Sequence, residues 1–190
     1  MKTIVTATTL ALMAGGALAA PEKYILEPAH SQVVFSYNHL GFSTTYNMFA
    51  GFEGAIMFDR EDPANSSVEV AIPVMSMFTG WQERLGHFMS EEFFGAAEGD
   101  MVTFVSTGIE VTGDETAKIT GDLTMNGVTR EVVLDARLNK AADHPMAGKP
   151  WAGFDATAMV KRSDFGLDMF APAISDEVEV VISIEAGKAD

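Results

Sequence analysis

Apolar and polar side chains alternate along much of the chain, which predicts β-strands. In TAKITGDLTMN, residues 116–126, Ile119 and Leu123 share one face while charged and hydroxyl side chains occupy the other. A period of two residues is typical of a sheet with one solvated face. Asn126-Gly127 follows, a dipeptide that tolerates the positive φ angles of a tight hairpin turn. We therefore expect a β-hairpin whose return strand begins at 128.

The same alternation recurs from end to end. It is clear in DEVEVVISIEAG, residues 176–187, and weaker versions occur at 23–27, 31–38, 45–58, 66–74, 101–112 and 151–162. With the hairpin, these segments give nine candidate strands. Most neighbours are joined by short turn-like segments, which favours antiparallel order over crossover connections. Only 79–94 departs from the pattern, because Trp81, Leu85 and Phe88 fit one face of a short amphipathic helix.

A chain with many strands and little helix usually closes into a barrel or stacks as a sandwich. Small residues occupy five positions on the expected inner faces: Gly121, Ala136, Ala152, Ala156 and Ala158. A two-sheet core needs bulk at such positions to reach interior packing density. A barrel of about eight strands is wide enough to hold one small ligand. Phe35 or Phe52 could instead fill the space, so composition alone leaves a hollow and a filled barrel open.

The first residues indicate an exported protein. Residues 1–19 combine Lys2 with an apolar run that ends in Ala17-Leu18-Ala19, the pattern of a secretory signal peptide cleaved after Ala19. We expect residues 20–190 to form a single domain in the periplasm. Without Lys2, the formal net charge of −15 becomes −16, which argues against nucleic acid and anionic membranes as partners. The chain has no Cys, and no later segment is apolar enough to span a bilayer.

Catalysis and metal binding find little support. The imidazoles lack the spacing of a metal site, and they are His30, His39, His87 and His144. There is no G-x-S-x-G elbow, and Ser31 beside His30 lacks an orienting acid. The adjacent acids Glu91 and Glu92 are more typical of surface charge than of an acid/base pair. We expect no catalytic residue, no metal and no cofactor.

Four polar residues have structural interpretations. His30 is expected to hydrogen-bond the backbone near a strand entry. Arg130, beside the hairpin turn, can extend its head into water. Arg162 and Asp164 are expected to fix a polar corner before Phe165.

Five blocks of the sequence form an ordered set. The first is HSQVVFSYNHLGFSTTYNMFAGFEG at 30–54, and the others are TGWQERLGHFMSEEFF, VTFVSTGI, GDLTMNGVTREVVL and RSDFGLD. In this order they resemble the YceI-like family of periplasmic lipid-binding proteins, and the resemblance extends over the chain from about 22 to 186. The resemblance implies an all-β fold, an extended eight-stranded antiparallel lipocalin-like β-barrel with a short helix in one connection. It also implies a polyisoprenoid lipid inside, which favours the hollow barrel.

Rings and methionines can supply adaptable apolar walls for such a ligand. The resemblance places His39 and His87 near the open region of the barrel, where they are candidates for contact with a lipid head group. For any single ring, core packing is the alternative. The expected ligand-contacting residues are Phe35, Tyr37, His39, Phe42, Met48, Phe52, Phe78, Trp81, Leu85, His87, Phe88, Phe94, Met125 and Phe170.

The expected function is that of a periplasmic carrier holding a polyisoprenoid lipid, such as a prenylated quinone or a prenyl phosphate, without catalysis. Strands of ~10 residues at about 3.3 Å per residue give a tunnel of roughly 33 Å, comparable to a folded octaprenyl chain. Two alternatives stay open: a binder of a fatty acid or fatty amide in envelope stress, and a filled barrel that acts as an interaction module. We expect no nucleic-acid partner and no stable membrane insertion, while a homodimer stays open.

Overall fold

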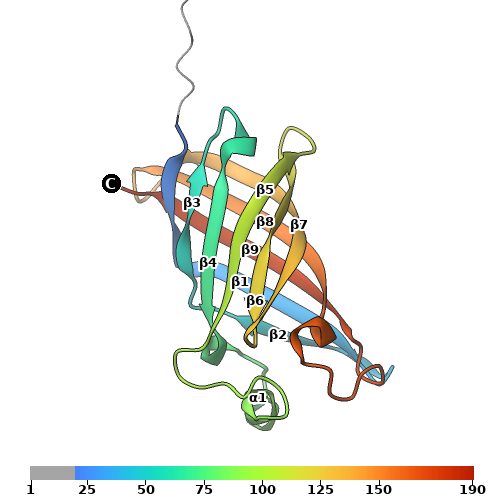
Figure 1. Cartoon of the computed structure of the whole chain (residues 1–190). Coiled ribbons are helices and arrows are strands. Elements are labelled where there is room, and N and C mark those ends of the chain that lie inside the picture. Colours follow the sequence, from blue (N-terminus) through green and yellow to red (C-terminus); the bar gives the residue numbers. More distant parts are fainter. Residues whose placement is uncertain (1–19) are drawn as a thin grey trace, which may run out of the picture.

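Nine antiparallel strands form one sheet, which closes on itself because the first strand pairs with the last (Figure 1). The computed structural model describes residues 20–190, so the expected signal peptide at 1–19 lies outside the described residues. The strands are β1 (Glu22–His39), β2 (Ser43–Phe49), β3 (Glu53–Phe58), β4 (Ser67–Pro73), β5 (Met101–Val111), β6 (Thr116–Met125), β7 (Val128–Asp143), β8 (Pro150–Lys161) and β9 (Glu177–Lys188). The helix α1 spans Gln82–Met89, and short 3-10 helices span Pro63–Asn65, Val74–Ser76 and Arg162–Phe165.

The nine strands occupy eight positions around the barrel. β2 pairs with the second half of β1, from His39 opposite Ser43 to Val33 opposite Phe49. β3 pairs with the beginning of the same strand on the same edge, and its outer edge pairs with β4. The expected strand at 45–58 is therefore interrupted at 50–52, where Gly51 has a φ of 72°. The eight-stranded antiparallel barrel with one short helix is confirmed.

β1 unites two segments that were expected as separate strands, 23–27 and 31–38. The ladder with β9 shifts register between Glu27 and Gln32, which is a β-bulge. The Glu27 carboxylate accepts the backbone N–H groups of Ala29, at 3.1 Å, and His30, at 2.8 Å. These bonds satisfy amides within the bulge, so the strand continues. The expected contact of His30 with backbone is corrected in one respect, because its ring Nδ1 lies 2.8 Å from the Glu27 carboxylate.

The β6–β7 hairpin forms at the expected place. Met125 pairs with Val128, and the two turn residues Asn126 and Gly127 have φ angles of 52° and 72°. Positive φ at both positions matches the tight turn predicted from this dipeptide. The short helix expected within 79–94 forms at Gln82–Met89. It ends where Ser90 leaves the helical conformation, and the N–H and hydroxyl of Ser90 both donate to the carbonyl of His87.

The barrel has two different ends. One end, at the bottom of Figure 1, carries α1, the β1–β2 turn, the β6–β7 turn and the loop between β8 and β9, and we call it the helix end. The other carries both ends of the described chain and is called the terminal end. Near the terminal end, Phe58 lies edge-on to Tyr24 and to Phe154, with ring centroids 5.7 and 5.5 Å apart. The apolar core thus gathers on the wall formed by β8, β9, β1, β3 and β4.

Candidate ligand cavity

A cavity of about 1220 Å³ occupies the barrel interior. It exceeds the roughly 300–1,000 Å³ of common small-molecule sites. Its walls come from every strand and from α1, and they are predominantly apolar. Inward side chains of β6 and β7 line it, among them Ile119, Leu123, Val132 and Leu134. These side chains are only half-buried although they point into the barrel, because they face empty space rather than other side chains.

Small residues keep this part of the barrel open. Ala136, Ala156 and Ala158 line the cavity, as their inward positions predict. A Cβ placed on Gly121 would lie 2.4 Å from Cζ of Phe104, so the Phe104 ring rests against the wall in the space of the absent side chain. Ala152 has a different place, because it is almost completely buried in the core cluster. The glycine therefore lets a large ring line the lumen without a side chain at 121 in its way.

Aromatic rings from three elements surround the opening at the helix end. Phe88 on α1 lies edge-on to Tyr37 on β1, with ring centroids 6.2 Å apart, and edge-on to Phe93, at 5.6 Å. The His87 ring lies 4.8 Å from that of Phe93 and 6.4 Å from that of Phe170. All five side chains line the cavity. The ring cluster thus connects the barrel wall, the helix and the β8–β9 loop around one mouth.

The charged and polar side chains at this mouth, Arg84 and His87, interact with neighbouring residues of the protein. Arg84 lines the cavity, donates from Nη1 to the carbonyl of Thr79 at 2.9 Å, and lies over the Trp81 ring at 6.0 Å. His87 Nε2 lies 3.2 Å from Oε2 of Glu92, with both side chains exposed. The mouth accordingly presents a guanidinium and an imidazole at its edge, in front of an apolar interior.

Arg162 holds the β8–β9 loop together. Its guanidinium donates to the carbonyls of Ser175, Met169 and Ile174, each at 2.9 Å, and also to that of Leu167. Burial lowers the pKa of Arg162 from its ordinary value, although nearby carboxylates, that of Asp176 foremost, oppose the effect. Because its donors are engaged with backbone, this arginine serves the loop more than any guest in the cavity.

The acidic partner of this corner is Asp176, which corrects the expected role of Asp164. The Asp176 carboxylate accepts hydrogen bonds from the backbone N–H and the hydroxyl of Ser163, at 2.9 and 2.7 Å. These two bonds lower the pKa of Asp176 from its ordinary value. The corner is therefore fixed across the loop, between its first and last residues, rather than within the Arg162–Asp164 segment.

Comparison with known proteins assigns the chain to a family. A family model of the YceI-like domain matches residues 24–186. Protein YceI of Escherichia coli O157:H7 is 41% identical over 180 residues, which cover 95% of this chain and 93% of that protein. The chain belongs to the YceI-like family. The resemblance carried by the five sequence blocks is thereby confirmed.

Solved structures share the fold of this YceI-like chain. The crystal structure of BcnA from Burkholderia cenocepacia superposes with a TM-score of 0.76, at 23% identity, and covers 85% of this chain and 99% of that one. A polyisoprenoid-binding domain from Saccharophagus degradans, implicated in plant cell wall breakdown, gives a TM-score of 0.66 at 15% identity. That match covers 89% of this chain and 99% of the other.

The YceI-like barrel brings ten of the fourteen expected ligand-contacting residues to the cavity. They are Phe35, Tyr37, His39, Phe52, Trp81, His87, Phe88, Phe94, Met125 and Phe170. Phe42, Met48, Phe78 and Leu85 do not line it. Phe42 lies at the β1–β2 turn and is 89% exposed, Phe78 is 64% exposed, and Leu85 packs from α1 against the core cluster. Met48 alternates with the cavity-lining Phe49 on β2 and forms a backbone bridge with Phe78. That the ten contact a ligand remains a prediction.

Part of the cavity wall was not predicted from the sequence. Four further residues line the cavity: Val70 on β4, Phe104 on β5, and Val180 and Ile182 on β9. The signal that could have found the β9 pair is the period-two inner face of 176–187, which marks these residues as inward. An inward position in a filled barrel is a core position, so the pattern alone does not separate wall from core.

The described part of the chain meets the requirements of neither a metal centre nor a membrane-spanning helix. Between residues 20 and 190, no three His, Cys, Asp or Glu side chains are grouped so that they could hold a metal ion. Within the same residues, no helix has the length and apolar character needed to cross a bilayer.

Proposed function

We propose that this protein is a periplasmic carrier that holds a polyisoprenoid lipid, such as a prenylated quinone or a prenyl phosphate, inside its barrel and does not convert it. The observation that carries the proposal is the large apolar cavity whose lining side chains on β6 and β7 lack packing partners across the lumen. The polyisoprenoid-binding domain of S. degradans, which shares the fold, supports this choice of ligand class. The Ala17-Leu18-Ala19 pattern at the end of the first apolar run supports the periplasmic location.

Burial of hydrocarbon supplies enough free energy for capture from water. Each methylene group removed from water contributes about 0.8 kcal/mol. Some 15 such groups therefore contribute about 12 kcal/mol in gross terms, the scale of a nanomolar dissociation constant. A polyisoprenoid that is only partly enclosed already meets this requirement. A fatty acid or fatty amide is the shorter alternative, and the volume of the cavity favours the longer chain.

Polar groups near the mouth are available to orient a head group. Tyr37 and His39 lie on the inner face of β1 and line the cavity. Neither the Tyr37 hydroxyl nor the His39 ring forms a hydrogen bond with another described residue. His87 and Arg84 stand at the same end. The arrangement provides donors and acceptors for a head group, and it contains no nucleophile held by a neighbouring base, which supports binding without catalysis.

Lipid extraction from natively expressed protein, followed by mass spectrometry, tests the proposal. We expect a prenyl lipid in near one-to-one amount. Filling the lumen with Ala136→Phe/Ala158→Phe should abolish its retention, because both alanines line the cavity. Thr157→Phe is the matched control, because Thr157 lies on the exposed face of β8 beside Ala158; this variant should retain lipid. Protein that stays empty after challenge with an octaprenyl quinone and an octaprenyl phosphate would contradict the proposal, and recovery of a fatty acid alone would favour the shorter ligand.

A further inference from the structure

Four exposed apolar side chains at the helix end serve neither the core nor the cavity. Leu40 and Phe42 lie in the β1–β2 turn, Tyr46 lies on the outer face of β2, and Phe78 pairs with the neighbouring Met48. Their exposed fractions are 50%, 89%, 64% and 64%. We call these four residues the rim. Large apolar side chains exposed together indicate a surface that is covered in use.

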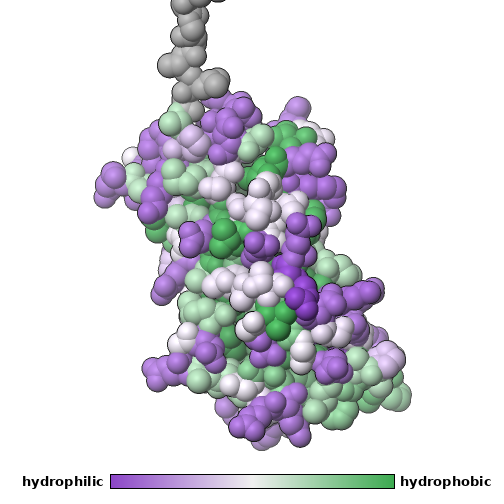
Figure 2. All heavy atoms as spheres, viewed as in Figure 1, coloured by the Kyte–Doolittle hydropathy of each residue, from purple (hydrophilic) through white to green (hydrophobic). Residues whose placement is uncertain are grey.

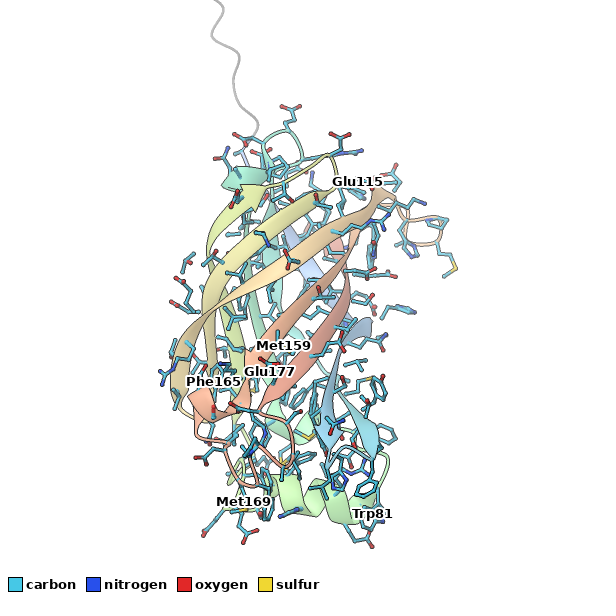
Figure 3. All side chains as sticks on the ribbon, turned by 90° about the vertical axis from the view of Figure 1, so that its right-hand side faces the viewer. Trp81, Glu115, Met159, Phe165, Met169 and Glu177 are labelled. Carbon is cyan, nitrogen blue, oxygen red and sulfur yellow. The ribbon has the colours of Figure 1, made fainter. Side chains whose placement is uncertain are left out.

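The rim is continuous with the mouth of the cavity. The Leu40 N–H donates to the carbonyl of Ala173 at 3.2 Å, and His39 forms a bridge with Ile174, so the turn is tied to the β8–β9 loop. That loop carries Phe170, which is exposed and also lines the cavity. Trp81 combines the same two properties at the start of α1. Figure 3 shows Trp81 and Met169 at this end of the barrel, opposite Glu115.

The rim is also free of charge. Residues 31–52 contain no Lys, Arg, Asp or Glu, in a chain that has 12 basic and 27 acidic residues. Figure 2 shows hydrophobic residues gathered at the lower right, over the end where the β1–β2 turn and the β8–β9 loop lie, whereas hydrophilic residues dominate the top. A strongly acidic molecule is repelled by anionic surfaces, but the segment 31–52, which carries three of the four rim residues, can meet a neutral surface without carboxylates of its own.

We propose that the rim docks on the surface of a zwitterionic phospholipid bilayer and places the mouth of the cavity against the leaflet. Trp, Tyr and Phe side chains are favoured at the boundary between head groups and acyl chains. A lipid can then pass between leaflet and cavity without its hydrocarbon crossing water. A second copy of the chain would fit the rim less well, because it would cover the mouth through which the ligand enters. This inference rests on the proposed lipid-binding function.

Vesicle binding by residues 20–190, which contain the whole closed barrel, tests the docking surface. We use phosphatidylcholine vesicles with brominated acyl chains and a Trp151→Phe background, in which Trp81 is the remaining one of two Trp residues. Docking should quench the fluorescence of Trp81. Leu40→Asn/Phe42→Ser and Tyr46→Ser/Phe78→Ser should each weaken vesicle binding at least about tenfold, because each removes apolar surface that the bilayer buries. Asn at position 40 suits its positive φ of 56°.

Val133→Ser/Met146→Ser is the matched control, since it removes two exposed apolar side chains that lie away from the rim. It should bind vesicles like the unaltered protein. Addition of phosphatidylglycerol should weaken binding at low salt and do so less at high salt, because the chain is acidic. Any of three results would overturn the inference. They are stronger binding to anionic vesicles, no quenching of Trp81 fluorescence, and a dimer in analytical sedimentation that disappears in the rim variants.

The lipid content of every variant separates the two proposals. Rim variants do not alter cavity-lining residues, so they should still contain extractable lipid. Protein that contains lipid but does not bind vesicles would refute the docking proposal and leave the carrier proposal standing. Protein that is empty in every form would refute the carrier function itself.

Discussion

Arg162 shows how one side chain can determine the shape of a loop. Its guanidinium reaches four backbone carbonyls between Leu167 and Ser175, which otherwise have no strand or helix partner to satisfy them. Hydrogen bonds from a charged donor are stronger than neutral ones, and unsatisfied buried carbonyls are costly. The loop in turn positions Phe170 at the mouth of the cavity. The geometry of the mouth therefore depends on a residue that contributes little to the apolar wall.

Arg162→Met should lower the free energy of unfolding by about 2–4 kcal/mol, because several carbonyls lose their donor at once. Urea denaturation followed by far-ultraviolet circular dichroism measures the loss. Arg130→Met is the matched control, since Arg130 is exposed and bonds only the adjacent Thr129 carbonyl. A loss for Arg162→Met within about 0.5 kcal/mol of the control, the usual scale for surface changes, would show that the loop does not need this clamp.

Asp176 should make stability depend on acid pH. Its pKa is lowered in the folded protein by the N–H and hydroxyl of Ser163. Its contribution is therefore fully present above the ordinary value of 3.8 and is lost as the pH falls through the lower folded value. The difference in stability between the unaltered protein and Asp176→Asn should be constant from about pH 5 to 7 and shrink below pH 4. Urea titrations at several pH values measure this difference, and a difference that does not change with pH would contradict it.

At the scale of elements, the interruption between β2 and β3 lets one barrel position serve two purposes. β2 continues the wall toward the helix end, whereas β3 pairs on both edges, with β1 and with β4. Gly54 at the start of β3 has a φ of 144°, and a Cβ there would lie 2.1 Å from the carbonyl oxygen of Glu69. Only a residue without a side chain permits this close approach of β3 to β4.

Gly54→Ala should therefore lower the free energy of unfolding by about 1–3 kcal/mol or more, through backbone strain and a clash with β4. Thermal and urea unfolding measure the change. Gly108→Ala is the control within β5, because a Cβ there meets nothing within 4 Å and its φ is not positive. Its effect should lie within about 0.5 kcal/mol. Equal effects at the two glycines would refute the role of the close approach.

Local patterns predicted the elements better than they predicted the site. The β6–β7 hairpin was found because its turn and its alternation are both encoded within a few residues. The continuity of β1 was missed because the irregular residues 28–31, which have no ladder partner on β9, are held by the Glu27 carboxylate. Alternation of apolar and polar positions does not indicate such a contact. Phe42 and Phe78 were expected in the cavity but face outward, because the facing of a turn and of a bridged residue depends on neighbours distant in sequence. Aromatic character alone does not distinguish a wall from a rim.

At the scale of the whole molecule, the hollow interior makes stability a function of its contents. The core cluster lies on the side of β8, β9, β1, β3 and β4, while β6 and β7 hold half-buried apolar side chains against the cavity. A ligand that binds only the folded barrel stabilises it according to its concentration relative to the dissociation constant. The guest replaces packing that the protein does not provide for itself.

Removal of bound lipid should lower the midpoint of thermal unfolding. Lipid at 100 times its dissociation constant stabilises by about 2.7 kcal/mol, which corresponds to roughly 5–10 °C for a chain of this size. Calorimetry of lipid-filled and extracted protein measures the shift, with refilling by an octaprenyl quinone as the reverse test. The lumen-filled variant Ala136→Phe/Ala158→Phe should show no shift on lipid addition. An identical midpoint for filled and extracted protein would contradict the role of the cavity.

The ladder between β1 and β9 also decides when this molecule can finish folding. It joins Tyr24 to Lys188 and Ser36 to Glu179, whereas the other ladders join strands that are neighbours or near neighbours along the chain. A polypeptide synthesised from its amino end can form its hairpins as they appear, yet one edge of β1 stays unpaired until β9 is complete. Such late, long-range joining is slow, and an unmatched strand invites association with other chains. The last strand therefore closes the barrel. A chain without it would keep unpaired strand edges and would tend to aggregate with other chains instead of forming a closed barrel.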